Sequence, residues 1–197
     1  KIIQAIQKSN ELTIEVWATT SDLRQEGPAR IVSLSRDTSN RNFTLGQERD
    51  QWDFRLRTTR TSNNGMPSLP AGSKSVNDEL THIVFARDRS GEATIYLNGK
   101  QTARRKIDGD FKNWDGSYRL SLGNELTGDR LWRGTLHLVA IYSRALSAAE
   151  AAEHFQSGPA SEALQQQLAA VRQERSTRNF HEHIAPLLVN HCFECHA

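Results

Sequence analysis

The sequence has few cysteines, one methionine and no long apolar run. Only Cys192 and Cys195 occur among its 197 residues, so no cysteine remains for a disulfide framework in the rest of the chain. No apolar run approaches the ~20 residues that a membrane-spanning helix needs. The formal net charge is +2, which is too small to indicate a nucleic acid or an anionic membrane as partner. With 37% hydrophobic and 24% charged residues, the composition instead fits a folded globular chain.

Short segments with a period of two fill most of the chain before residue 147. Residues 12–18 alternate between apolar and mainly polar side chains, which predicts a half-buried strand. Asn98-Gly99 is typical of a type I′ hairpin turn. Many short strands with turn signals between them predict an all-β sandwich. The further predicted strands cover residues 29–34, 43–45, 52–56, 80–86, 93–97, 101–106, 118–123 and 134–142.

Polar segments between the strands are candidates for binding. Residues 58–78 are rich in Ser, Asn, Gly and Pro, and they predict a long surface loop of the kind on which binding functions often lie. Arg55 and Arg57 point away from the apolar positions of their strand, either as a solvated sheet face or as a polar ligand face. Three tryptophans are either an exposed ligand platform or core and rim residues: Trp17, Trp114 and Trp132.

The pattern becomes helical after residue 146. Ser147-Ala148-Ala149-Glu150 is a capping box, and the short helix that follows is expected to end at Gly158-Pro159. Residues 161–175 predict a weakly amphipathic linker helix. A third helical stretch leads into Cys192. We therefore divide the chain into a β-sandwich over residues 1–158, a helical linker over 159–178 and the start of a further domain over 179–197.

The last residues carry the most specific motif. Cys192-Phe193-Glu194-Cys195-His196 has the spacing of c-type haem attachment, in which both thiols bond to the haem edge and His196 binds the iron. The alternatives are part of a zinc site, which needs about four ligands, a redox-active cysteine pair, or a chance spacing. Covalent haem c is attached outside the cytoplasm, so the motif predicts a periplasmic, exported or cell-surface protein.

Further ligands for this haem are not evident in the sequence. The only methionine, Met66, lies far away in the predicted loop. Three histidines are either distal ligands, ligands of a neighbouring haem, or exposed helix residues: His181, His183 and His191. Because the chain opens with Lys1-Ile2-Ile3 and not with Met and a signal peptide, we expect it to be a processed or internal piece of a longer protein.

Three stretches of the β-rich part resemble laminin G-like domains with a concanavalin A-like jelly roll. They are Thr13-Ile14-Glu15-Val16-Trp17, the hairpin at residues 93–100, and the segment 134–147 that ends in Tyr142-Ser143-Arg144-Ala145-Leu146-Ser147. The resemblance covers residues 1–158 and implies an antiparallel sandwich that binds or spaces, with its first strand cut short at Lys1. It departs from the family at His137, where many members have an acidic residue.

The same resemblance raises the question of calcium, since related lectin-like domains often bind it through about 6–8 oxygen ligands. Two groups of side chains offer such oxygens, and each is alternatively a set of turn-forming residues. The groups are Asn124, Glu125 and Asp129, and Asp37, Asn40 and Asn42.

Residues 179–197 resemble the opening helix and haem motif of planctomycete-type cytochrome c domains, and residues 41–47 and 124–130 resemble the laminin G-like modules fused to them. About twenty residues cannot enclose a haem, because domains below ~40 residues need extra support. The resemblance therefore implies that the distal ligand and most of the pocket lie beyond Ala197.

Two functional hypotheses follow. In the first, the chain is a fragment of an exported multidomain c-type cytochrome that exchanges electrons with other redox proteins or haem domains through the haem on Cys192, Cys195 and His196. In the second, the β-sandwich is a carbohydrate- or protein-binding module with no redox role of its own. We expect no enzyme in either case, because glycoside hydrolysis needs two carboxylates across a cleft and no such pair is evident.

Overall fold

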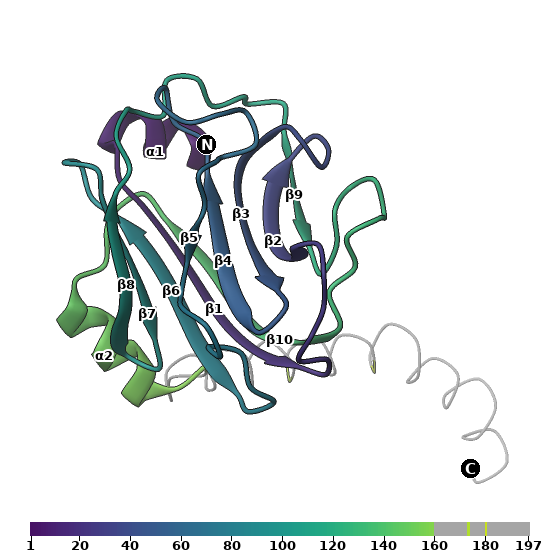
Figure 1. Cartoon of the computed structure of the whole chain (residues 1–197). Helices are drawn as coiled ribbons and strands as arrows, with labels where there is room; N and C mark the ends of the chain where they lie inside the picture. Colours follow the sequence, from purple (N-terminus) through teal and green to yellow (C-terminus); the bar gives the residue numbers. More distant parts are fainter. Residues whose placement is uncertain (160–172, 174–179, 181–197) are drawn as a thin grey trace, which may run out of the picture. The chain divides into compact units, whose positions relative to one another are not determined.

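The computed structural model describes residues 1–159, 173 and 180 of the chain (Figure 1). The chain divides into two units, Lys1–Pro159 and Ala160–Ala197. Cys192, Cys195 and His196 lie outside the described residues, as does nearly all of the predicted linker and cytochrome segment. Among the described residues, no helix is both long and apolar enough to span a membrane.

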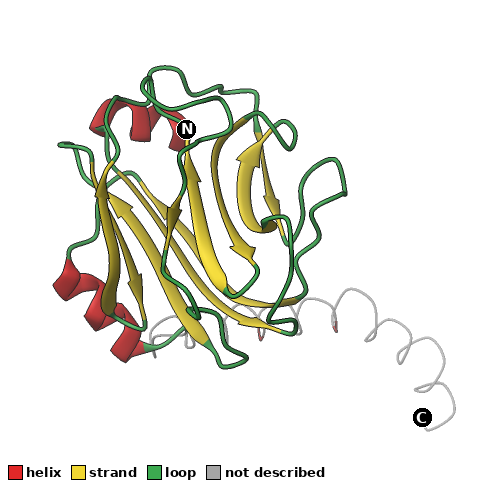
Figure 2. Ribbon diagram, in the orientation of Figure 1, coloured by secondary structure: helices red, strands yellow, loops and turns green. Residues whose placement is uncertain are grey.

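Two five-stranded antiparallel sheets make up the first unit (Figure 2). The strand order is β10-β1-β6-β7-β8 in one sheet and β5-β4-β3-β2-β9 in the other. This arrangement confirms the predicted antiparallel sandwich. The strands are β1 (Leu12–Thr20), β2 (Ala29–Ser35), β3 (Arg41–Glu48), β4 (Gln51–Leu56), β5 (Leu69–Pro70), β6 (Thr81–Arg87), β7 (Glu92–Leu97), β8 (Lys100–Lys106), β9 (Arg119–Leu122) and β10 (Gly134–Tyr142).

The main core lies between the two sheets. Alternate residues of each strand point inward, so apolar side chains from both sheets meet there. The Phe54 ring of one sheet stacks on the Phe85 ring of the other. Each large side chain buried in this way contributes about 1.5–3 kcal/mol relative to an exposed one. The largest fully buried apolar side chains include Trp52, Phe43, Phe54, Phe85, Phe111, Leu12 and Ile14.

Helix α2 (Ala148–Ser157) confirms the predicted capping box. The Ser147 hydroxyl accepts a hydrogen bond from the Glu150 amide, and the Glu150 carboxylate accepts one from the Ser147 amide. The helix ends at Gly158, as predicted. Its Ala151, together with Leu146 just before the helix, packs against Val84, Ala86 and Tyr96 on the outer face of the β10-β1-β6-β7-β8 sheet, and these residues form a second apolar cluster.

The position of α2 corrects one expectation. Strand β1 is buried on both faces, not half-buried, because α2 covers the face that carries Glu15 and Trp17. The predicted hairpin turn also meets this helix. Asn98 and Gly99 have φ angles of 50° and 74°, as a type I′ turn requires. A Cβ at Gly99 would lie 3.1 Å from the Cα of Ala152, so the turn approaches α2 closely.

The amino-terminal segment differs from the truncated strand implied by the family resemblance. Residues 2–9 form helix α1 (Ile2–Ser9), with Ile6 buried in the main core. Ile2, Ile3 and Ile6 recur at helical spacing, which gives the helix an apolar side. Asn10, in a left-handed conformation, ends it by donating its amide to the carbonyl of Ile6. Figure 1 shows α1 and α2 at opposite ends of the sandwich.

Candidate functional site

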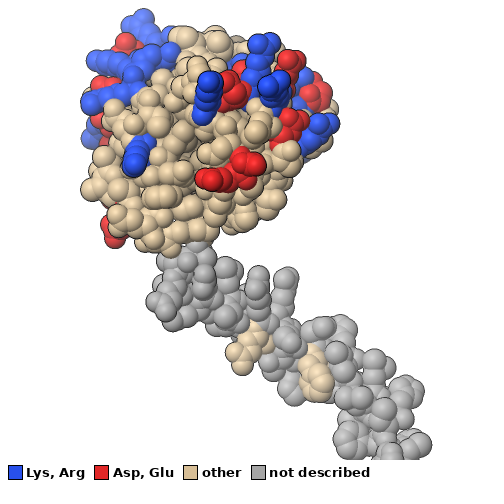
Figure 3. Space-filling model, turned by 60° about the horizontal axis from the view of Figure 1, so that its bottom comes forward, with Lys and Arg blue, Asp and Glu red and all other residues tan. Residues whose placement is uncertain are grey.

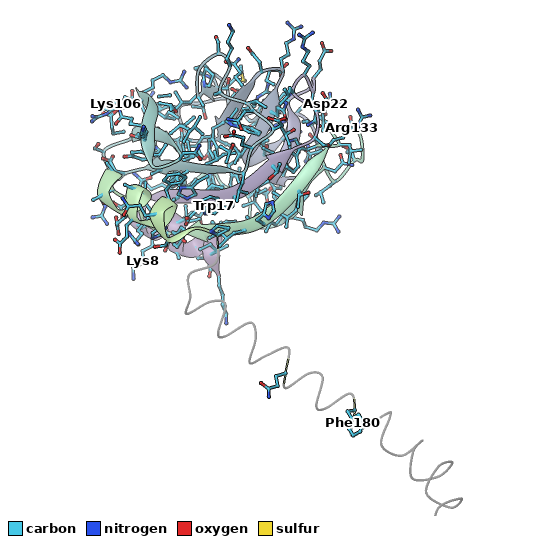
Figure 4. All side chains as sticks on the ribbon, turned by 90° about the horizontal axis from the view of Figure 1, so that it is seen from below. Lys8, Trp17, Asp22, Lys106, Arg133 and Phe180 are labelled. Carbon is cyan, nitrogen blue, oxygen red and sulfur yellow. The ribbon has the colours of Figure 1, made fainter. Side chains whose placement is uncertain are left out.

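A groove of about 650 Å³ lies where the segment that follows β4 meets the end of β8. It joins the two sheets at one edge of the sandwich, because β5 and β8 are both edge strands. We call it the basic groove. Figure 4 labels Lys106 on this side of the unit, across from the Asp22–Arg133 ion pair. Its lining residues are Arg60, Thr61, Pro67, Arg105, Lys106, Ile107, Asp108 and Gly109.

A buried arginine fixes the floor of the basic groove. Arg87 is 1% exposed, and it donates hydrogen bonds to the carbonyl oxygens of Ile107 at 3.1 Å and Gly109 at 2.5 Å. Its guanidinium lies 4.8 Å from the centre of the Phe111 ring. Burial lowers the pKa of Arg87, and the nearby aspartates counteract this, but a guanidinium remains charged at neutral pH. A positive charge therefore lies directly behind the groove backbone.

The two walls of the basic groove are tied together by short contacts. The Thr58 hydroxyl donates to the carbonyl of Asp108 at 2.6 Å, and the Thr59 amide donates to the carbonyl of Asp110 at 2.9 Å. Gly109 has a φ of +90°, and a Cβ there would lie 2.8 Å from the Thr59 hydroxyl oxygen. Only glycine fits this approach without strain. The groove is thus a fixed feature of the unit.

Positive side chains outnumber negative ones around the basic groove. Arg60, Arg105 and Lys106 face a single acid, Asp108. Lys106 and Asp108 lie 3.8 Å apart with 63% and 70% of their side chains exposed, so their attraction is weak. The Arg105 guanidinium donates to the Pro67 carbonyl at 2.8 Å. Within residues 1–159 the Arg60 guanidinium has neither an ion-pair nor a hydrogen-bond partner.

Charge is unevenly distributed over the surface. On the face shown in Figure 3, blue side chains predominate at the upper left, blue and red lie beside one another at the upper right, and most of the lower part is uncharged. A second groove of about 540 Å³ has three cations and two acids among its lining residues, and Arg49 pairs with Glu26 at 3.7 Å. Its lining residues are Leu23, Arg24, Glu26, Arg49, Asp50, Lys74 and Val76.

The predicted tryptophan platform is wrong. Trp17, Trp114 and Trp132 are only 4%, 5% and 4% exposed. The Trp114 indole donates to the carbonyl of Arg57 at 2.7 Å, and the Trp132 indole donates to the Gln47 side-chain oxygen at 3.1 Å. The rings serve packing and internal hydrogen bonding, which is the other interpretation that the sequence allowed.

Arg55 and Arg57 form neither a freely solvated row nor an open ligand face. Arg55 donates to Asp53 at 3.3 Å with 17% of its side chain exposed, and Arg57 donates to the Tyr118 hydroxyl at 3.4 Å. On the same sheet, Arg30 and Glu125 form a buried ion pair at 3.1 Å. Each of these arginines is thus engaged by a polar partner within the unit.

The residues predicted as calcium ligands are engaged in turn contacts or in contacts with distant parts of the unit. Asp37 accepts hydrogen bonds from the amides of Ser39 and Asn40 at 2.8 Å and 2.9 Å, and the Asn124 side chain accepts from the amides of Glu125 and Arg130. Asn42 is bonded to the backbone of Asp115, and Glu125 to Arg30. No group of three or more His, Cys, Asp or Glu residues in the described part is placed to hold a metal ion. Calcium binding stays a prediction.

A family model described as the concanavalin A-like lectin/glucanases superfamily matches residues 3–152. The chain belongs to this superfamily. The match confirms the resemblance of the β-sandwich to laminin G-like domains, and it does not extend to the predicted cytochrome segment. A search of curated proteins found no match.

Solved structures share the fold of this laminin G-like domain. The binding domain of botulinum neurotoxin DC, solved with rat synaptotagmin II, has 14% identity and a TM-score of 0.56 over 77% of this chain and 36% of its own. A structure named only as a receptor binding domain has 14% identity and a TM-score of 0.61, covering 80% and 37%. A putative carbohydrate binding protein from Bacteroides ovatus has 16% identity and a TM-score of 0.54, covering 75% and 41%.

These three structures are thus named as a neurotoxin binding domain, a receptor binding domain and a putative carbohydrate binding protein. The chain spans well under half the length of each of them. Sequence reasoning found one wall of the basic groove, because Arg60, Thr61 and Pro67 lie in the loop predicted over residues 58–78. It missed the other wall, Arg105–Gly109, since no local pattern indicates which strand end will meet that loop.

Proposed function

We propose that the laminin G-like domain is a non-catalytic module that binds a glycan in the basic groove. The observation that carries this proposal is the combination of outward-facing cations with a backbone floor held by Arg87. Sites that are fixed before binding lose less conformational entropy when the ligand arrives. The neighbouring receptor-binding and carbohydrate-binding domains on the same fold support a binding role.

A catalytic role on this fold has less support. Glycoside hydrolysis uses a pair of carboxylates on either side of the scissile bond. The basic groove is lined by one carboxylate, that of Asp108. We therefore assign recognition and not hydrolysis to the groove.

The proposal is tested with the full chain on an array of neutral and acidic glycans, and with two matched variants. Arg60→Ala removes a groove cation that has no partner within the unit, so the fold should be unaffected. Arg104→Ala is the control, because Arg104 neighbours Arg105 on β8 but pairs with Glu92 at 3.1 Å and does not line the groove. Binding that weakens in the first variant only supports the proposal. Equal binding by both variants would place the ligand elsewhere.

The carboxy-terminal motif carries a second proposal, which is that haem c is attached at Cys192 and Cys195 with His196 as an iron ligand. Such a haem would supply one-electron transfer to other redox proteins, and it would place the protein in the periplasm or at the cell surface. These residues lie outside the described part, so the proposal depends on their spacing alone.

This second proposal is tested by making the full chain with a haem-attachment system in the periplasm and measuring its mass and visible spectrum. A covalent adduct that is lost in Cys192→Ala and Cys195→Ala supports it. A low-spin spectrum would indicate a distal ligand within or beside the chain, and a high-spin spectrum a ligand beyond Ala197. An unmodified mass despite active machinery would refute haem attachment and leave the glycan proposal intact.

A further inference from the structure

We infer that the basic groove selects an anionic sugar, with a uronic acid or a sulfated sugar as the ligand class. This inference rests on the proposed glycan-binding function and adds the chemistry that the groove recognises. It follows from the charges, donors and acceptors of the groove-lining residues.

The first observation is the donor set. A guanidinium has five N–H donors in a planar fork that matches a carboxylate or sulfate. The guanidinium of Arg105 donates one hydrogen bond, to the carbonyl of Pro67, and the guanidinium of Arg60 has no partner within residues 1–159. Both therefore keep donors for an incoming anion. Lys106 and the buried charge of Arg87 add to the positive potential at the same place.

The second observation is Asp108, which distinguishes a sugar from a bare anion or an acidic peptide. Its exposed carboxylate can only accept hydrogen bonds, so it matches the hydroxyl groups of a sugar ring. An acidic peptide would bring carboxylates to the groove but few hydroxyl donors for Asp108, whereas an anionic sugar brings both. The exposed ring of Pro67 offers an apolar surface for the C–H groups of the sugar.

The third observation is the volume of the basic groove, together with the difference in charge between this groove and the second groove. A volume of about 650 Å³ falls within the ~300–1,000 Å³ typical of small-ligand sites. It suits one or two sugar rings. The second groove is of similar size and also has three cations, but two acids line it instead of one, so we expect a weaker preference for anions there.

The test is titration calorimetry of the full chain with four probes. They are trigalacturonate, its fully methyl-esterified form, a sulfated galactose trisaccharide and a hexaglutamate peptide. We expect the anionic sugars to bind at least about tenfold more tightly than the methyl ester, since hydrogen bonds to charged groups contribute about 1.5–3 kcal/mol. The affinity should fall as salt is raised. The stronger of the two anionic sugars identifies the anion as carboxylate or sulfate.

Variants separate this inference from the proposed function. Arg60→Ala and Arg105→Ala should each weaken trigalacturonate or sulfated-sugar binding by about tenfold or more. Arg105→Lys should weaken it too, because lysine keeps the charge and loses the planar fork. Arg104→Ala should bind as the unchanged chain does. The Arg60 side chain has no partner within residues 1–159, so we expect Arg60→Ala to fold normally. The test therefore remains valid even if Arg105→Ala unfolds.

Each of the other possible results would overturn a different part of the proposal. Equal binding of the methyl ester and the acid, with Arg60 still required, would overturn the anion preference and keep glycan binding in the groove. Tighter binding of hexaglutamate than of any sugar would overturn the sugar assignment. Binding of no glycan, neutral or acidic, would overturn the proposed function itself.

Discussion

The carboxylate of Glu15 lies 3.0 Å from Nδ1 of His154, and this contact joins strand β1 to helix α2. The same carboxylate is 2.9 Å from Nε2 of His82 on β6, and it accepts a hydrogen bond from the Tyr142 hydroxyl of β10 at 2.7 Å. Glu15 is 3% exposed. A buried carboxylate with this many partners ties the helix and three neighbouring strands into one polar network beneath α2.

Glu15→Gln should lower the free energy of unfolding by about 1–3 kcal/mol, because the amide keeps the shape but loses the charge-assisted hydrogen bonds. The measurement is urea unfolding at neutral pH followed by circular dichroism. Glu153→Gln is the matched control, since Glu153 is an exposed residue of the same helix. Equal midpoints for the two variants would contradict a stabilising role for the network.

The pH dependence of stability should reveal the same carboxylate. Burial alone would raise the pKa of Glu15, but the hydrogen bonds from His82 and Tyr142, together with His154, outweigh it and lower the pKa to about 2 from 4.5. A depressed carboxylate pKa stabilises the fold above the unfolded value, and this stability is lost as the pH falls through the folded value. At about 1.4 kcal/mol for each pKa unit, the charged form contributes about 3 kcal/mol.

The unchanged chain should therefore lose about 3 kcal/mol more than Glu15→Gln between about pH 5 and pH 2. Comparing the two proteins cancels the other carboxylates with depressed pKa values, such as Asp37 and Glu150. The measurement is the unfolding free energy at several pH values. Parallel curves for the two proteins would show that Glu15 is not the group responsible.

The strands were predictable from the sequence because their alternation reflects a two-layer core. Residues 134–142 were predicted as a strand with the observed bounds, and 93–97 differ from β7 by one residue. Burial on the outer face of β1 was not predictable from the sequence of that strand, because the helix that covers it, α2, lies more than 100 residues later in the chain. Helix α1 carried a signal, the spacing of Ile2, Ile3 and Ile6, but a family resemblance suggested a strand there instead.

The basic groove was predictable only in part for a similar reason. The composition of residues 58–78 indicates a loop, but nothing local shows that Arg60 will face Arg105 and Lys106. That relationship comes from the packing of the two sheets, in which the edge strands β5 and β8 contact each other. Long-range pairing of this kind is set by packing, and neither propensity nor short motifs encode it.

Trp17→Ala distinguishes a packing role of this side chain beneath α2 from a role in binding a glycan. Its ring stacks on His82, with centroids 4.6 Å apart, and on Phe155 of α2 at 5.8 Å. Removing it should lower the unfolding free energy by about 3–5 kcal/mol, because a large cavity opens beneath the helix. Trp17→Phe should cost less, since it keeps a stacking ring. Loss of glycan binding with unchanged stability would restore the platform interpretation.

Gly109→Ala should show that the floor of the basic groove depends on a close backbone approach. The new Cβ would lie 2.8 Å from the Thr59 hydroxyl oxygen and 2.9 Å from the Arg60 amide nitrogen, at a φ of +90°. The segment that carries Arg60 must then move, so both stability and affinity for an acidic trisaccharide should fall, the former by about 1–3 kcal/mol. The control for this prediction is Gly116→Ala. No atom lies within 4 Å of the position that its Cβ would take, and the φ of Gly116 is not in the left-handed region. That variant should keep its affinity, with a stability change of no more than about 1 kcal/mol. If Gly109→Ala bound and unfolded like Gly116→Ala, the groove would be adaptable, and its preference for a ligand would have to come from charge alone.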